Sequence, residues 1–230
     1  MIALARVHTE ASSNGRTADF GSADEGSNPS ASTSAPRHPA GRAANQRAEV
    51  KHLPMPERAV LVGLGAPPRR LLLDVAHELQ AIFGPPIEQG PGQERPQYAF
   101  NKDRNQYHST AVLRRLAQSR GGAAVPVIGL TDADLFVPDA PFVFGEADRD
   151  ANAAVVSIAR LQHGPDGKPA DPGRLTRRAA VEAVHEFGHL LGLSHCADAR
   201  CAMYLSHKPS DTDRKGPGLC LTCRGALGLP

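Results

Sequence analysis

The sequence predicts a mixed α/β (α+β) domain in which strands and helices alternate. Two observations support this fold class. Short apolar runs alternate with segments of helical periodicity between residues 59 and 191, the order expected when strands are joined by helices. In addition, 40% of the 230 residues are hydrophobic, and a chain of this size and composition can bury a substantial core.

Composition and charge argue against several classes of protein. The net charge is only +2, and basic residues are mixed with acidic ones, so no basic face for nucleic acid or lipid stands out. No apolar run approaches the roughly 18 residues that a membrane span needs. The first residues lack the charged start and long apolar centre of a secretory signal. We therefore expect a cytoplasmic monomer that binds neither nucleic acid nor membranes.

The first 54 residues differ from the rest of the chain. They are rich in Ser, Ala, Gly and Pro and have no helical or strand period, so they cannot bury enough apolar surface to offset the entropy lost on ordering. We predict that residues 1–54 are disordered, or are an extension that is not translated. The T-arm of a transfer RNA gene would encode Gly26–Pro29 if it were translated, and Ser12–Arg16 fits a D-arm in the same frame. Met55 then precedes the first apolar segment.

The first half of the domain is predicted to contain two strands and two helices. Residues 59–64 are a short apolar run typical of a buried strand, and residues 71–83 have apolar side chains at helical spacing. Residues 97–100 are compatible with a short strand. A second helix is expected over residues 110–119, because a pair of glycines follows it and can end it.

Three strands and a long helix are predicted to follow. The strands are expected at residues 125–130, 142–145 and 154–161. The third is apolar almost throughout, which predicts a central position, whereas the second is expected nearer an edge. The acidic, proline-containing stretch 131–141 is predicted to be a loop. A long helix is expected over about residues 175–191.

The predicted long helix contains two histidines that can share a metal ion. Residues four apart lie on one face of a helix, so His185 and His189 can bind one ion at roughly 2 Å. Glu186 follows the first histidine and can reach a water molecule held on the ion. Gly192 lies where a helix ends most easily through a left-handed residue, and that turn can bring His195 to the same ion.

This spacing predicts a catalytic zinc site. Three protein ligands leave one coordination position open for water, whereas a structural zinc site is closed. Zinc lowers the pKa of bound water to about 7, so Glu186 could accept the proton while the ion polarises a peptide carbonyl. Two alternatives stay open at this point. One is a chance match of the His-Glu-x-x-His pattern, and the other is a zinc-stabilised adaptor that binds peptides without cleaving them.

The four cysteines predict a second metal site. Two residues separate Cys220 from Cys223, as in a metal-binding hairpin, and Cys196 and Cys201 form a second pair. Four thiolates can close a tetrahedral site with metal–sulfur distances of about 2.3 Å. Disulfide bonds are the alternative, which the missing secretory signal disfavours. A cysteine-based zinc module for nucleic acid is a weaker alternative, because no basic face is evident.

Together, the two patterns resemble a known family. The run His185–His195 matches the metzincin signature, in which a methionine after the third histidine forms a turn beneath the metal. The cysteines around that methionine are more specific, and their order is similar to the archaemetzincin family. They occur as Cys196, Cys201-Ala202-Met203 and Cys220-Leu221-Thr222-Cys223.

The resemblance implies a fold and an activity. The implied fold is the zincin-like metzincin fold, a twisted, mostly parallel mixed sheet backed by helices, with an N-terminal subdomain over residues 55–192. A small C-terminal subdomain, held by a structural zinc ion on the four cysteines, would follow over residues 193–230. Met203 would support the catalytic zinc. The segment Phe142–Ala147 is similar to the edge strand beside the cleft, to which an extended peptide can pair. We therefore predict a zinc-dependent metallopeptidase with two zinc ions per chain, acting on peptides or proteins.

If the N-terminal extension is not translated, the native protein begins at Met55. Mass spectrometry of the intact protein from its native source should then give the mass of a chain that starts at this residue. A mass corresponding to a start at Met1 would contradict the hypothesis.

Overall fold

The computed structural model describes residues 55–119, 125–164 and 167–230. The predictions made for residues 1–54 lie outside these ranges. Within them, no helix is both long and apolar enough to cross a membrane. The division into subdomains after residue 192 stays a prediction.

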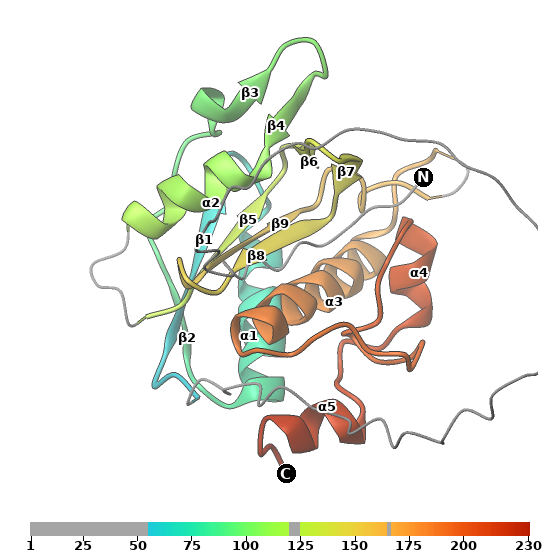
Figure 1. The fold of residues 1–230 in the computed structure, drawn as a ribbon. Coiled ribbons are helices and arrows are strands. Elements are labelled where there is room, and N and C mark those ends of the chain that lie inside the picture. The colour runs from blue at the N-terminus through green and yellow to red at the C-terminus, as the bar shows by residue number, and fades with distance from the viewer. Residues whose placement is uncertain (1–54, 120–124, 165–166) are drawn as a thin grey trace, which may run out of the picture. The chain divides into compact units, whose positions relative to one another are not determined.

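A five-stranded mixed sheet forms the centre of the fold (Figure 1). Its strands are β1 (Ala59–Leu64), β2 (Ile87–Gln89), β5 (Val127–Thr131), β8 (Gly145–Asp148) and β9 (Ala153–Ser157). Their order is β2-β1-β5-β9-β8, and all neighbours are parallel except β8, which runs antiparallel to β9. The mostly parallel sheet, the interior position of β9 and the edge position of β8 confirm the sequence predictions.

A second, four-stranded sheet was not expected. It has the order β3-β4-β6-β7 and consists of β3 (Phe100–Asn101), β4 (Gln106–His108), β6 (Leu135–Val137) and β7 (Ala140–Val143). The prediction of a loop over residues 131–141 was therefore wrong, because β6 and the start of β7 lie there. The strand predicted at 142–145 is divided between β7 and β8. These strands are too short to show a period of two, and Pro141 argued against a strand at this point.

Two other predicted boundaries need correction. Where a strand was predicted over 97–100, residues 97–99 form a 3₁₀ turn, η1 (Gln97–Ala99), and β3 begins at Phe100. The strand predicted over 154–161 ends at Ser157. There the Ser157 Oγ accepts a hydrogen bond of 3.2 Å from the N–H of Ala159, and this local bond turns the chain away from the sheet.

Helices cover both faces of the five-stranded sheet. Helices α1 (Arg69–Phe83) and α3 (Pro172–Leu190) lie on one face, and α2 (Ser109–Gln118) lies on the other (Figure 1). Successive side chains of a strand point to opposite faces. Accordingly, Leu61 of β1 packs with α1 and α3, whereas its neighbour Val62 packs in the cluster that contains α2.

Helix α3 positions the histidines and is unusually buried. It begins earlier than predicted, because the Asp171 side chain accepts a hydrogen bond of 2.9 Å from the N–H of Arg174 and because Pro172 suits the first helical turn. From Arg178 to Leu190 every residue is buried. A helix that is surrounded in this way places its polar side chains inside the protein.

Buried Arg178 anchors the C-terminal segment, residues 193–230, to α3. That segment contains two short helices, α4 (Pro209–Arg214) and α5 (Leu221–Ala226). The Arg178 guanidinium donates two hydrogen bonds of 2.7 Å to the carboxylate of Asp213 in α4. It donates two more, each of 2.8 Å, to the carbonyls of Leu161 and His163. One side chain thus joins α3, α4 and the loop after β9.

We expect the substitution Arg178→Met to destabilise the protein by about 2–3 kcal/mol, because it leaves two carbonyls and a carboxylate without their donor. Denaturant unfolding of the zinc-loaded protein measures this loss. Arg174→Met is the matched control, since Arg174 is exposed on the same helix and should contribute less than about 0.5 kcal/mol. Equal losses in the two variants would show that the Arg178–Asp213 pair is not an anchor.

Candidate active site

Three histidines from two segments meet at the end of α3. His185 and His189 lie one turn apart on the helix, and their Nε2 atoms are 3.0 Å apart. His195 comes from the loop that follows. One ring nitrogen from each of the three lies within 4.8 Å of the other two. His185 and His189 are buried and His195 is exposed, so solvent reaches the three histidines at His195.

The turn at Gly192 brings His195 back toward the helix. Gly192 has a φ of +94°, in the left-handed region that residues with a Cβ rarely adopt. Its N–H donates a hydrogen bond of 3.0 Å to the carbonyl of His189, and the N–H of Leu193 donates one of 2.9 Å to the carbonyl of Gly188. These bonds satisfy carbonyls at the helix end. The chain can therefore reverse immediately after its second histidine.

Backbone carbonyls set the tautomers of both helix histidines. His185 Nδ1 lies 2.8 Å from the Ala202 oxygen, and His189 Nδ1 lies 2.8 Å from the Leu193 oxygen. A carbonyl only accepts, so each Nδ1 donates and each Nε2 keeps a free lone pair. Burial lowers the pKa of both imidazoles to about 3, so they are neutral at neutral pH. Two lone pairs then face each other with no proton between them, an arrangement that a bound cation stabilises.

Glu186 lies beside the histidines in a buried position. It packs against β8 so closely that a Cβ at Gly145 would lie 2.6 Å from Glu186 Cγ. Within the described ranges, Glu186 Oε2 is the one buried side-chain oxygen or nitrogen with no hydrogen-bond partner. Burial raises the pKa of Glu186 well above its ordinary value, nearby Glu182 and Glu146 raise it further, and Lys215 opposes them. A carboxyl group with one unpartnered oxygen at this point suits proton exchange with a bound molecule.

The turn around Met203 packs against α3 next to the histidines. Met203 is buried, and a Cβ at Gly188 would lie 2.5 Å from its sulfur. The carbonyl of Met203 accepts a hydrogen bond of 2.9 Å from the N–H of Cys196. The structure thus brings together the methionine and the histidines that the sequence motif contains.

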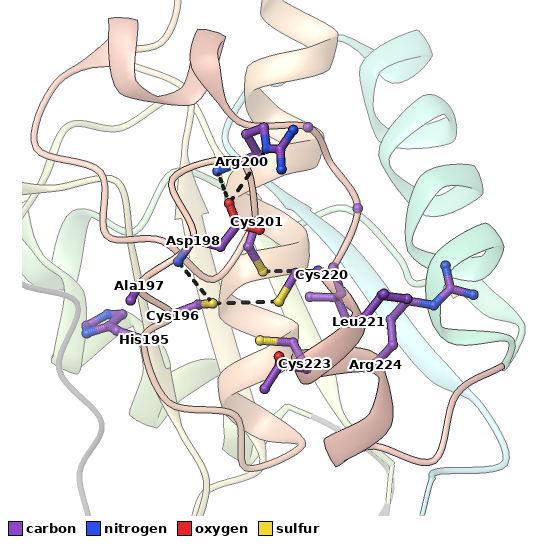
Figure 2. A pocket seen from close by; sticks show the side chains of 14 residues that line it. His195, Cys196, Ala197, Asp198, Arg200, Cys201, Cys220, Leu221, Cys223 and Arg224 are labelled. Carbon is purple, nitrogen blue, oxygen red and sulfur yellow. Dashed lines mark hydrogen bonds and ion pairs between the residues drawn. The ribbon is translucent and has the colours of Figure 1, made fainter.

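The four cysteines form a second cluster (Figure 2). All four are free, and Cys196 Sγ lies 3.7 Å from Cys220 Sγ. A tetrahedral site with metal–sulfur bonds of about 2.3 Å separates its sulfurs by about 3.8 Å, whereas a disulfide bond measures about 2.0 Å. The backbone N–H of Asp198 donates a hydrogen bond of 3.4 Å to Cys196 Sγ, and that of Cys220 donates one of 3.4 Å to Cys201 Sγ. A hydrogen bond from the backbone of Cys223 lowers the pKa of Cys220 to about 7, which favours the thiolate, whereas burial raises the pKa values of Cys201 and Cys223.

The two clusters are neighbours on the backbone. Cys196 directly follows His195, and both residues line an open hollow of about 910 Å³. In Figure 2 the His195 ring points away from the four sulfurs. One short segment therefore contributes to both clusters, with its side chains directed to opposite sides.

Three buried charged residues near the site were missed by sequence reasoning. Glu182 lies one turn before His185 on α3 and accepts a hydrogen bond of 2.7 Å from Ser206 Oγ. Lys215 Nζ lies 3.5 Å from Glu182 Oε1. Glu146 is buried in β8. Glu182 is three residues before His185, a helical spacing that puts both on one face of α3, so the sequence contained a signal for it. No local pattern indicates Lys215 or Glu146.

Comparison with known proteins identifies relatives over most of the domain. The model of Peptidase family M54 matches residues 69–228. The archaemetzincin of Thermococcus kodakarensis is 34% identical over 174 residues, which cover 73% of this chain and 94% of the relative. The archaemetzincin of Methanopyrus kandleri is 40% identical over 132 residues, which cover 57% of this chain and 71% of the relative.

Solved structures agree in fold. The archaemetzincin structure from Methanopyrus kandleri has a TM-score of 0.65 at 32% identity and covers 76% of this chain and 97% of its own. The archaemetzincin structure from Archaeoglobus fulgidus, complexed with malonate, has a TM-score of 0.63 at 31% identity. It covers 73% of this chain and 98% of its own. Membership of a peptidase family favours an enzyme over a catalytically idle zinc-binding adaptor. The chain belongs to the archaemetzincins, the zinc metallopeptidases of peptidase family M54.

Proposed function

We propose that His185, His189 and His195 hold the catalytic zinc ion of this metallopeptidase and that Glu186 is its general base. One observation supports this assignment above all others. Three histidine ring nitrogens meet within 4.8 Å, beside a buried carboxylate oxygen that has no partner. A zinc ion bound there supplies a Lewis acid, which polarises the scissile carbonyl and makes water more acidic.

Glu186 moves the proton in this scheme. Its Oε2 accepts a proton from the attacking water and later delivers that proton to the departing amine. Close packing against Gly145 keeps the carboxylate from turning away from the histidines. Burial stabilises the protonated carboxyl, and so the proton can stay on Glu186 between the two transfers.

The edge strand β8 suits an extended peptide substrate. In the described sheet, β8 pairs with β9 on one side and ends the strand order on the other. A peptide aligned with that edge would form backbone hydrogen bonds in the manner of an added strand. Because Gly145 of this strand contacts Glu186, the aligned peptide would pass beside the general base. This arrangement favours polypeptides over small molecules as substrates.

We further propose that the four cysteines hold a second, structural zinc ion. Four thiolates leave no coordination position open, so such a site stabilises a fold and does not activate water. The ion would join the start of α5, through Cys220 and Cys223, to the segment that follows His195. Together with Met203, it would keep His195 in place.

The substitution Glu186→Gln should preserve zinc binding and abolish most peptide cleavage. Glutamine has nearly the same shape against Gly145 but cannot take up a proton, and general-base catalysis contributes about 100-fold to 10,000-fold to rates. The measurements are zinc content per chain and kcat on a peptide library, with inhibition of the parent by a chelating hydroxamate as confirmation.

Glu94→Ala is the matched control for this experiment, since Glu94 is exposed and remote in sequence from the motif. It should retain the parent rate. If Glu186→Gln cleaved peptides as fast as the parent protein, Glu186 would not be the general base.

Substitution of one cysteine ligand should weaken the histidine site as well. In Cys220→Ser, loss of the structural zinc frees Cys196 and therefore His195, so we expect the affinity of the histidine site for zinc to fall on the order of tenfold. Competition with a chromogenic chelator measures that affinity. Thr222→Ser, an exposed change between two ligands, should have no effect. Full affinity in Cys220→Ser would count against coupling between the sites.

A further inference from the structure

We propose that Lys215 is a positioning residue for the histidine site. Its ammonium group holds the backbone carbonyls of Ala202 and Tyr204, on either side of Met203, and through the first of them orients His185. This inference rests on the proposed role of the histidines as metal ligands. It concerns a residue outside both metal-binding motifs.

The first argument is the complete burial of the lysine and its full set of partners. The Lys215 side chain is 0% exposed, which is rare for a lysine unless it is paired. Its Nζ donates hydrogen bonds of 2.6 Å to the Tyr204 carbonyl and 3.1 Å to the Ala202 carbonyl. Glu182 Oε1 lies 3.5 Å away. An ammonium has three donors, and here each has an acceptor.

The second argument is that one of these acceptors also binds a histidine. The Ala202 oxygen accepts from Lys215 Nζ at 3.1 Å and from His185 Nδ1 at 2.8 Å, which uses both of its lone pairs. The position of this oxygen determines the ring orientation of His185 and keeps its Nε2 free. Loss of a group that orients a metal ligand in this way typically lowers the metal affinity about tenfold to 100-fold.

The third argument is that Lys215 joins the turn around Met203 to α3. Glu182 of α3 accepts a hydrogen bond of 2.7 Å from Ser206 Oγ, just beyond the turn. Lys215 therefore connects two carbonyls of the turn to the helix turn that precedes His185. Without the ammonium, these carbonyls would lose their shared donor, and the turn could shift relative to the helix.

A simpler role for Lys215 would be to neutralise the buried charge of Glu182. The distances favour the carbonyls, because both lie closer to Nζ than the carboxylate does. The two roles also predict different behaviour when both charges are removed. In Lys215→Met with Glu182→Gln, neither member of this pair keeps a charge, yet the carbonyls still lack their donor.

The test compares Lys215→Met, Lys215→Arg and the double variant Lys215→Met/Glu182→Gln in the full chain. Zinc affinity of the histidine site is measured by chelator competition. Cobalt substitution adds a spectroscopic readout, since the d–d bands of a histidine site are distinct from the charge-transfer bands of a thiolate site. We expect Lys215→Met to lose affinity by about tenfold to 100-fold, with altered d–d bands and a lower kcat at nearly constant KM.

The other two variants separate positioning from charge balance. Lys215→Arg should recover most of the affinity, because a guanidinium can donate to both carbonyls. The double variant should recover part of the thermal stability lost in Lys215→Met but keep the weak metal binding. Lys208→Met, a change of an exposed lysine just before α4, is the control and should behave as the parent.

Parent-like metal affinity in Lys215→Met or in the double variant would overturn the inference. If Lys215→Met did not fold, the double variant would decide, since removal of Lys215 no longer leaves the charge of Glu182 without its partner. A parent protein that bound no zinc or cobalt at the histidines would instead refute the proposed function. The two failures are therefore distinguishable.

Discussion

Burial of the histidine-bearing half of α3 is the constraint on which the rest of the structure depends. From Arg178 to Leu190 every residue is buried, yet this stretch contains two histidines, two glutamates and an arginine. Polar groups removed from water destabilise a fold unless they are hydrogen-bonded or paired. The segments around the helix must therefore provide partners, and their positions follow from that requirement.

The C-terminal segment provides most of these partners. Asp213 pairs with Arg178. Lys215 lies beside Glu182. Backbone carbonyls of the same segment accept hydrogen bonds from both helix histidines. Glu186 is the exception, because one of its oxygens has no partner among the described residues. An unsatisfied group in a helix whose other polar side chains are satisfied marks the place where chemistry is expected.

The C-terminal segment also depends on these contacts for its own structure. Helices α4 and α5 have six residues each, too few to be stable alone in water. The Arg178–Asp213 pair anchors the first, and the cysteine cluster adjoins the second. Because Cys196 follows His195 directly, the contacts of Cys196 with Met203 and Cys220 lie next to the third histidine.

The sequence by itself determined the local features of this protein. Residues four apart share a face of any helix, so the motif His185–His195 predicted three ligands and a base, and the cysteine spacing predicted a second site. The longer apolar strands were also readable, whereas β6 and β7 were too short to show a period. Only the tertiary structure decided that Lys215 would meet Glu182, 33 residues away in the sequence. Such contacts depend on how the whole chain packs, and no local periodicity encodes that packing.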